Sequence, residues 1–150
     1  MKHGFALVLA LFIPLGAVAQ AAEPSLDDLI VSSDETTRLD DFLWISRPVV
    51  VFADRPEDPR FIEQMDRLAE APAMLAEREV VILTDTDPGM QSELRRKLRP
   101  RGFMLVLIGK DGAIELRKPL PWTVRELTRS IDKMPIRQRE IQMRHGTLNE

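Results

Sequence analysis

The chain contains no cysteine among its 150 residues. Disulfides, thiolate metal sites and cysteine nucleophiles are therefore excluded, because each of them needs a sulfur atom from a cysteine side chain. Exported proteins often gain stability from disulfides, so an exported chain of this composition must depend on its core alone. Thiol redox chemistry is the function class that the composition excludes most firmly.

Histidine and phosphate-binding loops are also scarce. His3 and His145 are the only histidines, and no glycine-rich phosphate loop occurs. A histidine-rich metal centre and a Ser-His-Asp triad are therefore not expected. Residues 85–87 contain two aspartates, but they lack the glycine and the distal glutamate of a calcium loop. We expect no cofactor and no metal site.

Only one long apolar run is present, and it lies at the start of the chain. Residues 4–18 are apolar, Lys2 precedes them, and small residues end in a cleavage pattern at Ala21. The run is shorter than the roughly 20 residues that a membrane span needs. The pattern predicts a signal peptide over residues 1–21 and a periplasmic or secreted protein without a membrane span after cleavage.

The rest of the chain is mildly acidic. Removal of Lys2 reduces the 21 basic residues to 20, against 24 acidic ones. This balance offers no general attraction to nucleic acid or to anionic membranes. A basic cluster at residues 93–101 is not interleaved with aromatic residues. We interpret it as a solvated face, and we expect no nucleic-acid partner.

A short apolar segment, Arg47–Ala53, organises the remaining sequence. It is rich in β-branched residues and apolar on both faces, which predicts a strand in the middle of a covered sheet. Trp44 and Ile45 are expected to pack near its start, with Trp44 as a core or lid residue rather than a ligand platform. Further strands are predicted at 79–84, 103–108 and 113–117, and helices are predicted after Ser25, Asp58, Asp87 and Thr123 and over 136–144.

The core elements follow the order β-α-β-α-β-β-α. Two βαβ steps predict parallel strands, and the final hairpin adds an antiparallel edge. This order is that of a thioredoxin-like three-layer α/β sandwich with a mixed four-stranded sheet. We expect an N-terminal extension over residues 22–45, the thioredoxin-like domain over 46–135 and a basic helical tail over 136–150.

The turn after the first central strand is the candidate functional site. Ligands of open α/β sheets bind at the carboxyl ends of the strands, and thioredoxin-like proteins carry their redox cysteines in this turn. Charged residues stand there instead, and arginines near a helix N-terminus favour an anion site. The candidate binding residues are Asp54, Arg55, Asp58, Arg60 and Arg101.

Two other interpretations of this turn remain open. In one, the charges neutralise each other and nothing binds. In the other, Asp54 and Asp58 serve a non-redox enzyme that acts on a small anionic substrate, although spacing within one loop does not fix the separation of two carboxylates. We favour a non-catalytic binding or interaction module that recognises an unknown envelope protein or a small anion. We assign no catalytic residues.

Six segments of the sequence match a family pattern in order and spacing. They are Trp44–Ala53, Glu57–Phe61, Gly102–Phe103, Val106–Gly112, Leu116–Arg117 and Met134–Glu140. On these segments the chain resembles the DUDES-type domain-of-unknown-function family of small exported bacterial proteins, a domain also found in vertebrate sushi-repeat matrix proteins. The resemblance covers residues 39–144. It implies a thioredoxin-like, peroxiredoxin-related fold and no established catalytic residues.

Overall fold

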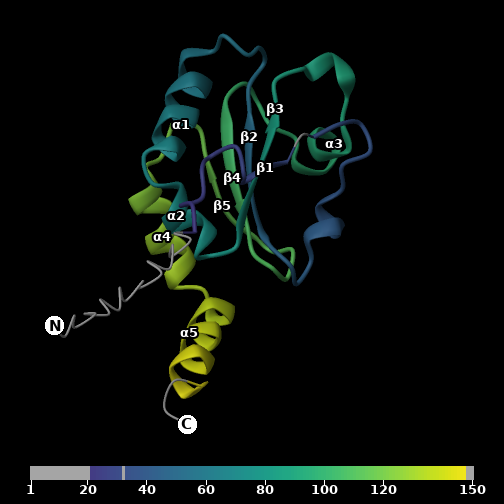
Figure 1. Ribbon diagram of the computed structural model, residues 1–150. Helices are drawn as coiled ribbons and strands as arrows, with labels where there is room; N and C mark the ends of the chain where they lie inside the picture. Colours follow the sequence, from purple (N-terminus) through teal and green to yellow (C-terminus); the bar gives the residue numbers. More distant parts are fainter. Residues whose placement is uncertain (1–20, 32, 148–150) are drawn as a thin grey trace, which may run out of the picture.

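A five-stranded mixed sheet lies between two helical layers in the computed structural model, which describes residues 21–31 and 33–147 (Figure 1). The predicted signal peptide lies outside the described residues except at position 21. The strand order is β1-β3-β2-β4-β5. The strands are β1 (Ile30–Val31), β2 (Arg47–Phe52), β3 (Val80–Asp85), β4 (Met104–Ile108) and β5 (Ile114–Lys118).

The central position of β2 confirms the prediction made from its apolar sequence. All six of its residues are buried, and it pairs with β3 on one side and β4 on the other. Val49 and Val51 face one core, while Val50 and Phe52 face a second core on the opposite side of the sheet. A strand needs apolar residues at every position when both of its faces are covered.

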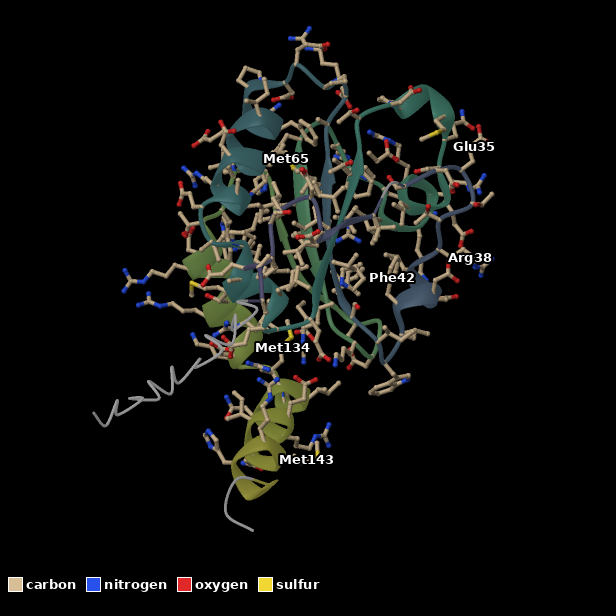
Figure 2. The ribbon with its side chains drawn as sticks, in the orientation of Figure 1. Glu35, Arg38, Phe42, Met65, Met134 and Met143 are labelled. Carbon is tan, nitrogen blue, oxygen red and sulfur yellow. The ribbon has the colours of Figure 1, made fainter. Side chains whose placement is uncertain are left out.

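Helices cover both faces of the sheet. The helices α1, α2 and α4 lie on one face and α3 lies on the other (Figure 1). Met65 of α1 and Phe42 accordingly lie on opposite sides (Figure 2). The helices are α1 (Pro59–Ala69), α2 (Pro72–Ala76), α3 (Glu93–Leu98), α4 (Val124–Asp132) and α5 (Pro135–Thr147), with short 3₁₀ turns η1 (Leu39–Phe42) and η2 (Pro88–Met90).

The sheet has one strand more than predicted. We expected a short helix after Ser25, but Ser25 bonds the Asp28 side chain in a turn, and the chain then forms β1. β1 pairs in parallel with β3, with Ile30 opposite Ile82, and is itself an edge strand of the sheet. Two apolar residues gave too short a pattern to indicate a strand, and pairing with the exposed edge of β3 decides their conformation.

The direction of β4 also differs from the prediction. β4 runs antiparallel to β2, with Phe52 opposite Met104, so only β1, β2 and β3 are parallel. The connection from β3 to β4 contains η2 and the six-residue α3. A six-residue helix is about 9 Å long, and a six-residue strand is about 20 Å long. The connection therefore does not return the chain to the amino end of β2.

Two local predictions need correction. The apolar spacing on α1 predicts one buried stripe, formed by Phe61, Ile62, Met65, Leu68 and Ala69. Ile62 is half exposed instead, and Gln64 is buried because its amide bonds both backbone groups of Trp122. Asp87 was expected to begin a helix, but it caps only η2, and Ser92 caps α3.

The helix caps predicted at Asp58 and Thr123 are confirmed. Asp58 caps α1 with Pro59 at the first helical position, and Thr123 and Glu126 form a reciprocal capping box at α4. The last helix, α5, projects past the end of the sheet and carries Met143 on its far half (Figures 1 and 2). Within the described residues, no helix combines the length and the apolar character that a membrane span requires.

Candidate binding site at the carboxyl end of the central strand

The turn between β2 and α1 is organised by one ion pair. The Asp58 carboxylate accepts a hydrogen bond from the backbone N–H of Arg60, with a length of 2.9 Å. The Arg60 side chain returns to the same carboxylate, where Nε lies 3.3 Å from Oδ1 and Nη2 lies 3.1 Å from Oδ2. Pro59 favours this geometry because it fixes the first helical residue and leaves the next N–H groups to the capping side chain.

A second loop, which leads into β4, meets this turn. Gly102 has a φ of +60°, and a methyl group on its Cα would lie 3.9 Å from Arg60 Nη2 and 4.0 Å from Asp54 Oδ2. Glycine suits this position because other residues rarely adopt a positive φ. The Arg60 guanidinium also stacks on the buried Phe103, 5.6 Å from the ring centre. Asp54, Arg60 and Gly102 therefore share one small surface.

Two of the predicted arginines are left unpaired. Arg55 and Arg101 are exposed, and neither side chain forms an ion pair or a hydrogen bond with any residue in the described part of the chain. Arg55 belongs to the turn itself, and Arg101 precedes Gly102 in the neighbouring loop. The structure thus brings together Asp54, Asp58 and Arg60, adds Arg55 beside them, and shows no direct contact between Arg101 and the other four.

The ion pair fixes the charge state of the turn. The side-chain hydrogen bond from Arg60 lowers the pKa of Asp58 below its ordinary value of 3.8, and the backbone N–H of Arg60 lowers it further. The same pairing raises the pKa of Arg60. Asp58 is therefore ionised at neutral pH, where it neither donates a proton nor acts as an effective base. The turn is suited to recognising charge rather than to transferring protons.

A buried polar cluster lies next to the start of the charged turn, at the carboxyl ends of β2 and β3. The Asp85 carboxylate, at the end of β3, accepts bonds from Ser92 Oγ at 2.5 Å and from Arg95 Nε at 2.8 Å. Arg95 also donates to the Ala53 carbonyl at 2.6 Å and stacks on the Phe52 ring at 5.4 Å. These contacts tie the carboxyl ends of β2 and β3 to α3, and they hold the start of the charged turn in place.

The sequence did not reveal this cluster. The sequence predicts Arg95 to be one of the solvated basic residues of 93–101, but its side chain is mostly buried. Lys97, another of these basic residues, is exposed and pairs with Asp40 at 3.1 Å. Asp85 was considered only as part of the rejected metal pattern. A carboxylate at the end of a buried strand requires a partner. The position of Asp85 therefore indicated a buried polar contact, but the sequence did not indicate that Ser92 and Arg95 are the partners.

A larger charge network lies at the opposite end of the sheet. Arg47, at the start of β2, is 0% exposed, and its guanidinium donates to Glu140 Oε1 at 2.9 Å and to the Arg78 carbonyl at 2.8 Å. Glu140 also pairs with Lys110 at 3.0 Å and with Arg137 at 3.4 Å. This network, which fastens α5 to the sheet, was not predicted, because its key partners are 93 residues apart.

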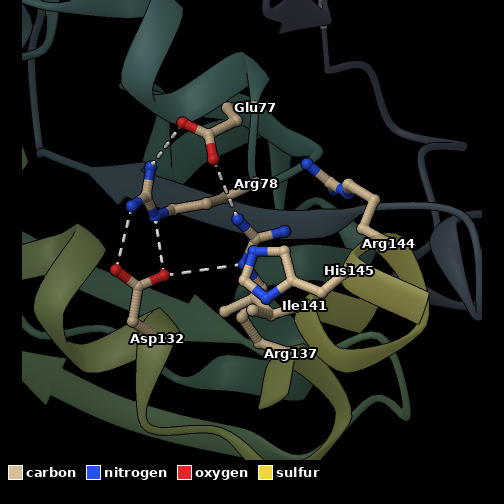
Figure 3. A pocket seen from close by; sticks show the side chains of 7 residues that line it. All are labelled: Glu77, Arg78, Asp132, Arg137, Ile141, Arg144 and His145. Atoms are coloured by element: carbon tan, nitrogen blue, oxygen red, sulfur yellow. Dashed lines mark hydrogen bonds and ion pairs between the residues drawn. The ribbon is translucent and has the colours of Figure 1, made fainter. Parts of the chain in front are cut away.

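The neighbouring pocket of about 310 Å³ contains further members of this network (Figure 3). Asp132 bonds Arg78 at 2.8 Å and lies 3.5 Å from Arg137 Nε, while Glu77 bridges the same two arginines. Each buried cation of this pocket thus faces a carboxylate (Figure 3). The pocket is held together by its own ion pairs, and we interpret it as structural.

A second cavity, of about 200 Å³, lies next to the charge network that holds α5 to the sheet, and Arg47 and Lys110 of this network line it. Trp44, predicted to be a core or lid residue, is 68% exposed and lines this cavity instead. Its backbone has a φ of +62°, and its N–H bonds the Lys110 carbonyl at 2.8 Å. The prediction failed because the hairpin turn after β4, rather than the core, fixes the conformation of this residue.

Metal binding gains no support from the described residues. No three His, Asp or Glu side chains among them gather as a metal site would require. His145 lines the pocket of Figure 3, next to Arg144, and His3 lies outside the described residues. The Arg99–Pro100 bond is trans, as are all other peptide bonds in the described part of the chain.

Comparison with solved structures identifies the fold. The chain is similar to the reduced 2-Cys peroxiredoxin of Plasmodium vivax, with a TM-score of 0.53 and 16% identity over 69% of this chain and 85% of that one. It is similar to chloroplastic thioredoxin z, with a TM-score of 0.54 and 16% identity over 69% and 92% of the chains. A thioredoxin-fold protein from Helicobacter pylori matches with a TM-score of 0.50 and 12% identity over 73% and 78%.

These similarities confirm the predicted thioredoxin-like α/β fold, with five strands in place of four. At such low identity they carry no functional assignment. The comparison with curated proteins gave no match. Residues 38–140 match the pattern of a family described as a domain of unknown function, DUF4174, and the match spans more than half of the sequence. The chain therefore belongs to the DUF4174 family.

Proposed function

We propose that this protein is an exported thioredoxin-like binding module that recognises an anionic partner and performs no redox chemistry. One observation carries the proposal: two exposed arginines with unpaired side chains accompany the Asp58–Arg60 ion pair, Arg55 in the turn at the carboxyl end of β2 and Arg101 in the loop that meets this turn. Unpaired cations near a helix N-terminus attract anions. The partner is a small anion or an acidic segment of an envelope protein.

The geometry favours binding over the alternative of a non-redox enzyme. That enzyme would use Asp54 and Asp58 on a small anionic substrate, and it needs one carboxylate able to hold or accept a proton. Asp58 is committed to Arg60 and to the helix cap. An enzyme would turn over its substrate and lose turnover in the Asp58→Asn variant, whereas a binding module would release its ligand unchanged.

Export is a separate part of the proposal. It rests on the apolar run at residues 4–18 and predicts a periplasmic or secreted protein that begins at Ala22. Mass spectrometry of the protein recovered from the envelope fraction tests it, and an intact Met1 would contradict it. The relation to vertebrate sushi-repeat matrix proteins, indicated by the sequence resemblance, is likewise part of the proposal.

The binding experiment compares two double variants of the mature protein. Arg55→Ala/Arg101→Ala removes the unpaired cations of the turn, and Arg125→Ala/Arg129→Ala removes two exposed cations of α4 as a control of equal charge. Both should fold with an unchanged melting temperature. Sulfate, citrate and immobilised acidic peptides are the probes, and ligand binding should raise the melting temperature of the native form and of the control. Equal responses from both double variants would exclude the turn as the site.

A further inference from the structure

The cavity beside Trp44 is a second candidate ligand site, separate from the charged turn. It has a volume of about 200 Å³ and an apolar wall. It lies at the amino end of β2, next to the turn of the β4–β5 hairpin, and is therefore at the opposite end of the sheet from Arg55 and Asp58. Three of the segments that carry the family resemblance meet here, namely 44–53, 106–112 and 134–140. A ligand at this cavity would not touch the charged turn, so the two sites can be tested independently.

The walls of this cavity provide an apolar contact surface. Trp44 presents an indole ring that is mostly exposed, and Met134, Pro135 and Ile136 line the cavity where the chain passes from α4 to α5. A bulky residue with a positive φ is strained and persists only where the surrounding structure enforces this conformation, and such strain concentrates at functional sites. Here the hydrogen bond to Lys110 enforces the conformation and keeps the indole beside the cavity rather than in the core.

The polar groups without partners at this cavity are mainly hydrogen-bond donors. Arg47 lines the cavity with a fully buried side chain, and its Nε has no hydrogen-bond acceptor in the described part of the chain. Arg139, also at the cavity, forms no ion pair with the described residues. Lys110 is already engaged by Glu79 and Glu140. A buried donor without an acceptor is costly, and a ligand that supplies an acceptor gains from it.

The acidic residues of the cavity limit the kinds of ligand that fit. Asp111 accepts a bond from the backbone N–H of Ala113 at 3.1 Å, but it forms no ion pair with the described residues and keeps an uncompensated negative charge. Glu115 forms no ion pair with the described residues and lies near Gly109, where a methyl group on the glycine Cα would be 3.1 Å from its carboxylate. Asp111 and Glu115 therefore both repel an anion on the hairpin side, so a carboxylate should lie on the Arg139 side.

The volume of the cavity limits the size of the ligand. At about 200 Å³, it is smaller than the roughly 300–1,000 Å³ of sites for drug-sized molecules. One aromatic or branched aliphatic group fits, together with one charged group at the rim. The pocket of Figure 3 is larger, and Arg137 Nε there also lacks a hydrogen-bond acceptor, but this atom already lies 3.5 Å from the Asp132 carboxylate and the same guanidinium pairs with Glu77.

We propose that the Trp44 cavity binds a carboxylate joined to one apolar group, with the apolar group against Trp44 and Ile136 and the carboxylate at Arg139. Two sources share this chemistry: a free small carboxylic acid, and the C-terminal residue of a peptide. The free acid is represented by 3-phenylpropionate. The peptide is represented by acetyl-Gly-Gly-Phe with a free C-terminus, and the amide of each probe is its uncharged control.

Trp44 itself can report binding. The chain has two tryptophans, so Trp122→Phe leaves Trp44 as the single fluorophore, and Trp122 bonds Gln64 only through its backbone. The proposal predicts a saturable blue shift of Trp44 emission with the carboxylates and at least a fivefold weaker response to the amides. A response to the peptide alone would identify a peptide site. A response to both carboxylates would identify a site for free acids as well.

Three variants separate recognition from folding. Arg139→Gln should weaken both carboxylates at least fivefold, whereas Arg129→Gln, an exposed arginine of α4, should not. Glu115→Gln should tighten them. Trp44→Gly relieves the positive φ while removing the indole, so calorimetry should show lost binding in a protein that melts no lower than the native form.

The same experiments define the results that overturn the proposal. The absence of a saturable shift with every probe, an equal response to acids and amides, or equal effects of Arg139→Gln and Arg129→Gln would each do so. A blue shift that grows with protein concentration in the absence of any probe, together with a dimer in light scattering, would assign the cavity to a second copy of this chain and would also overturn it.

Discussion

The two ends of β2 both carry charge, and they use it in opposite ways. At the amino end, Arg47 is fully buried and its charge is matched by Glu140. At the carboxyl end, Asp58 and Arg60 pair near the surface and Arg55 remains unpaired. Burial makes an unmatched charge costly, whereas exposed charges need no partner. The amino-end network therefore fixes the position of α5, and the charged turn is free to meet other molecules.

The largest effect should come from removing the carboxylate at the centre of the amino-end network. Glu140→Ala leaves Arg47 buried without its main counter-ion, and we expect the free energy of unfolding to fall by about 3 kcal/mol. Glu63→Ala, which removes an exposed pair with Arg67, is the control and should change little. Urea denaturation measures both. Equal, small losses would mean that the network does not hold α5.

Acid should weaken the same end of the molecule. Burial raises the pKa of Glu140, but hydrogen bonds from Arg47 and Lys110 outweigh it, so the pKa lies below its ordinary value of 4.5. Arg78 lowers the pKa of Asp132 below 3.8. Because both are lowered on folding, their stabilisation is complete above pH 4.5 and is lost as the pH falls through the lowered values.

This pH dependence can be assigned to one residue. Glu140→Gln should show a shallower decrease in the free energy of unfolding between about pH 5 and pH 3 than the native protein. Chemical denaturation at a series of pH values gives the two slopes. Parallel slopes would show that Glu140 has the same pKa in the folded and unfolded states, which contradicts its pairing with Arg47.

A smaller effect is expected at the loop beside the charged turn. Gly102→Ala places a side chain at a φ of +60°, and we expect a loss of roughly 1–2 kcal/mol in the free energy of unfolding. Gly146→Ala is the matched control, because nothing lies within 4 Å of its added methyl group. That control should be neutral or stabilising. Equal results would mean that the Gly102 loop relaxes away from Arg60.

The smallest effect should come from the surface ion pair. Asparagine is as good a helix cap as aspartate, so Asp58→Asn keeps the cap of α1 and removes only the pairing with Arg60. The melting temperature should fall by no more than about 2–4 °C, and differential scanning calorimetry measures it. Asp58→Ala removes the cap as well and should lower it further. A larger loss in the asparagine variant would place this ion pair among the structural contacts.

The sequence predicted those parts of the fold that depend on local patterns. The apolar run of β2 indicated a central strand, and Asp58 and Thr123 indicated helix caps, because both signals depend on neighbouring residues. The direction of β4 depends on whether the β3–β4 connection is long enough to return the chain to the amino end of β2. The formation of β1 depends on its pairing with β3. Neither property is encoded in a short pattern.

The candidate sites divide in the same way. The five candidate binding residues could be named because four of them lie between a strand end and a helix start and Arg101 lies just before another strand. The partners of Arg47, Asp85 and Trp44 could not, because they come from distant segments of the chain. Arg47 nevertheless stands at the start of an apolar strand, where a buried arginine needs a carboxylate nearby. The sequence therefore indicates that Arg47 has an acidic partner, but it does not indicate which residue this is.

The most direct test maps anion binding by nuclear magnetic resonance on residues 22–150, the proposed mature form of the protein. The ¹⁵N-labelled protein is titrated with sodium sulfate, and sodium chloride of equal ionic strength is the control. The account predicts saturable amide shifts at residues 54–60 and 101–103 that chloride does not reproduce. Shifts of equal size at the exposed arginines of α4, or no saturable shift at the turn, would contradict it.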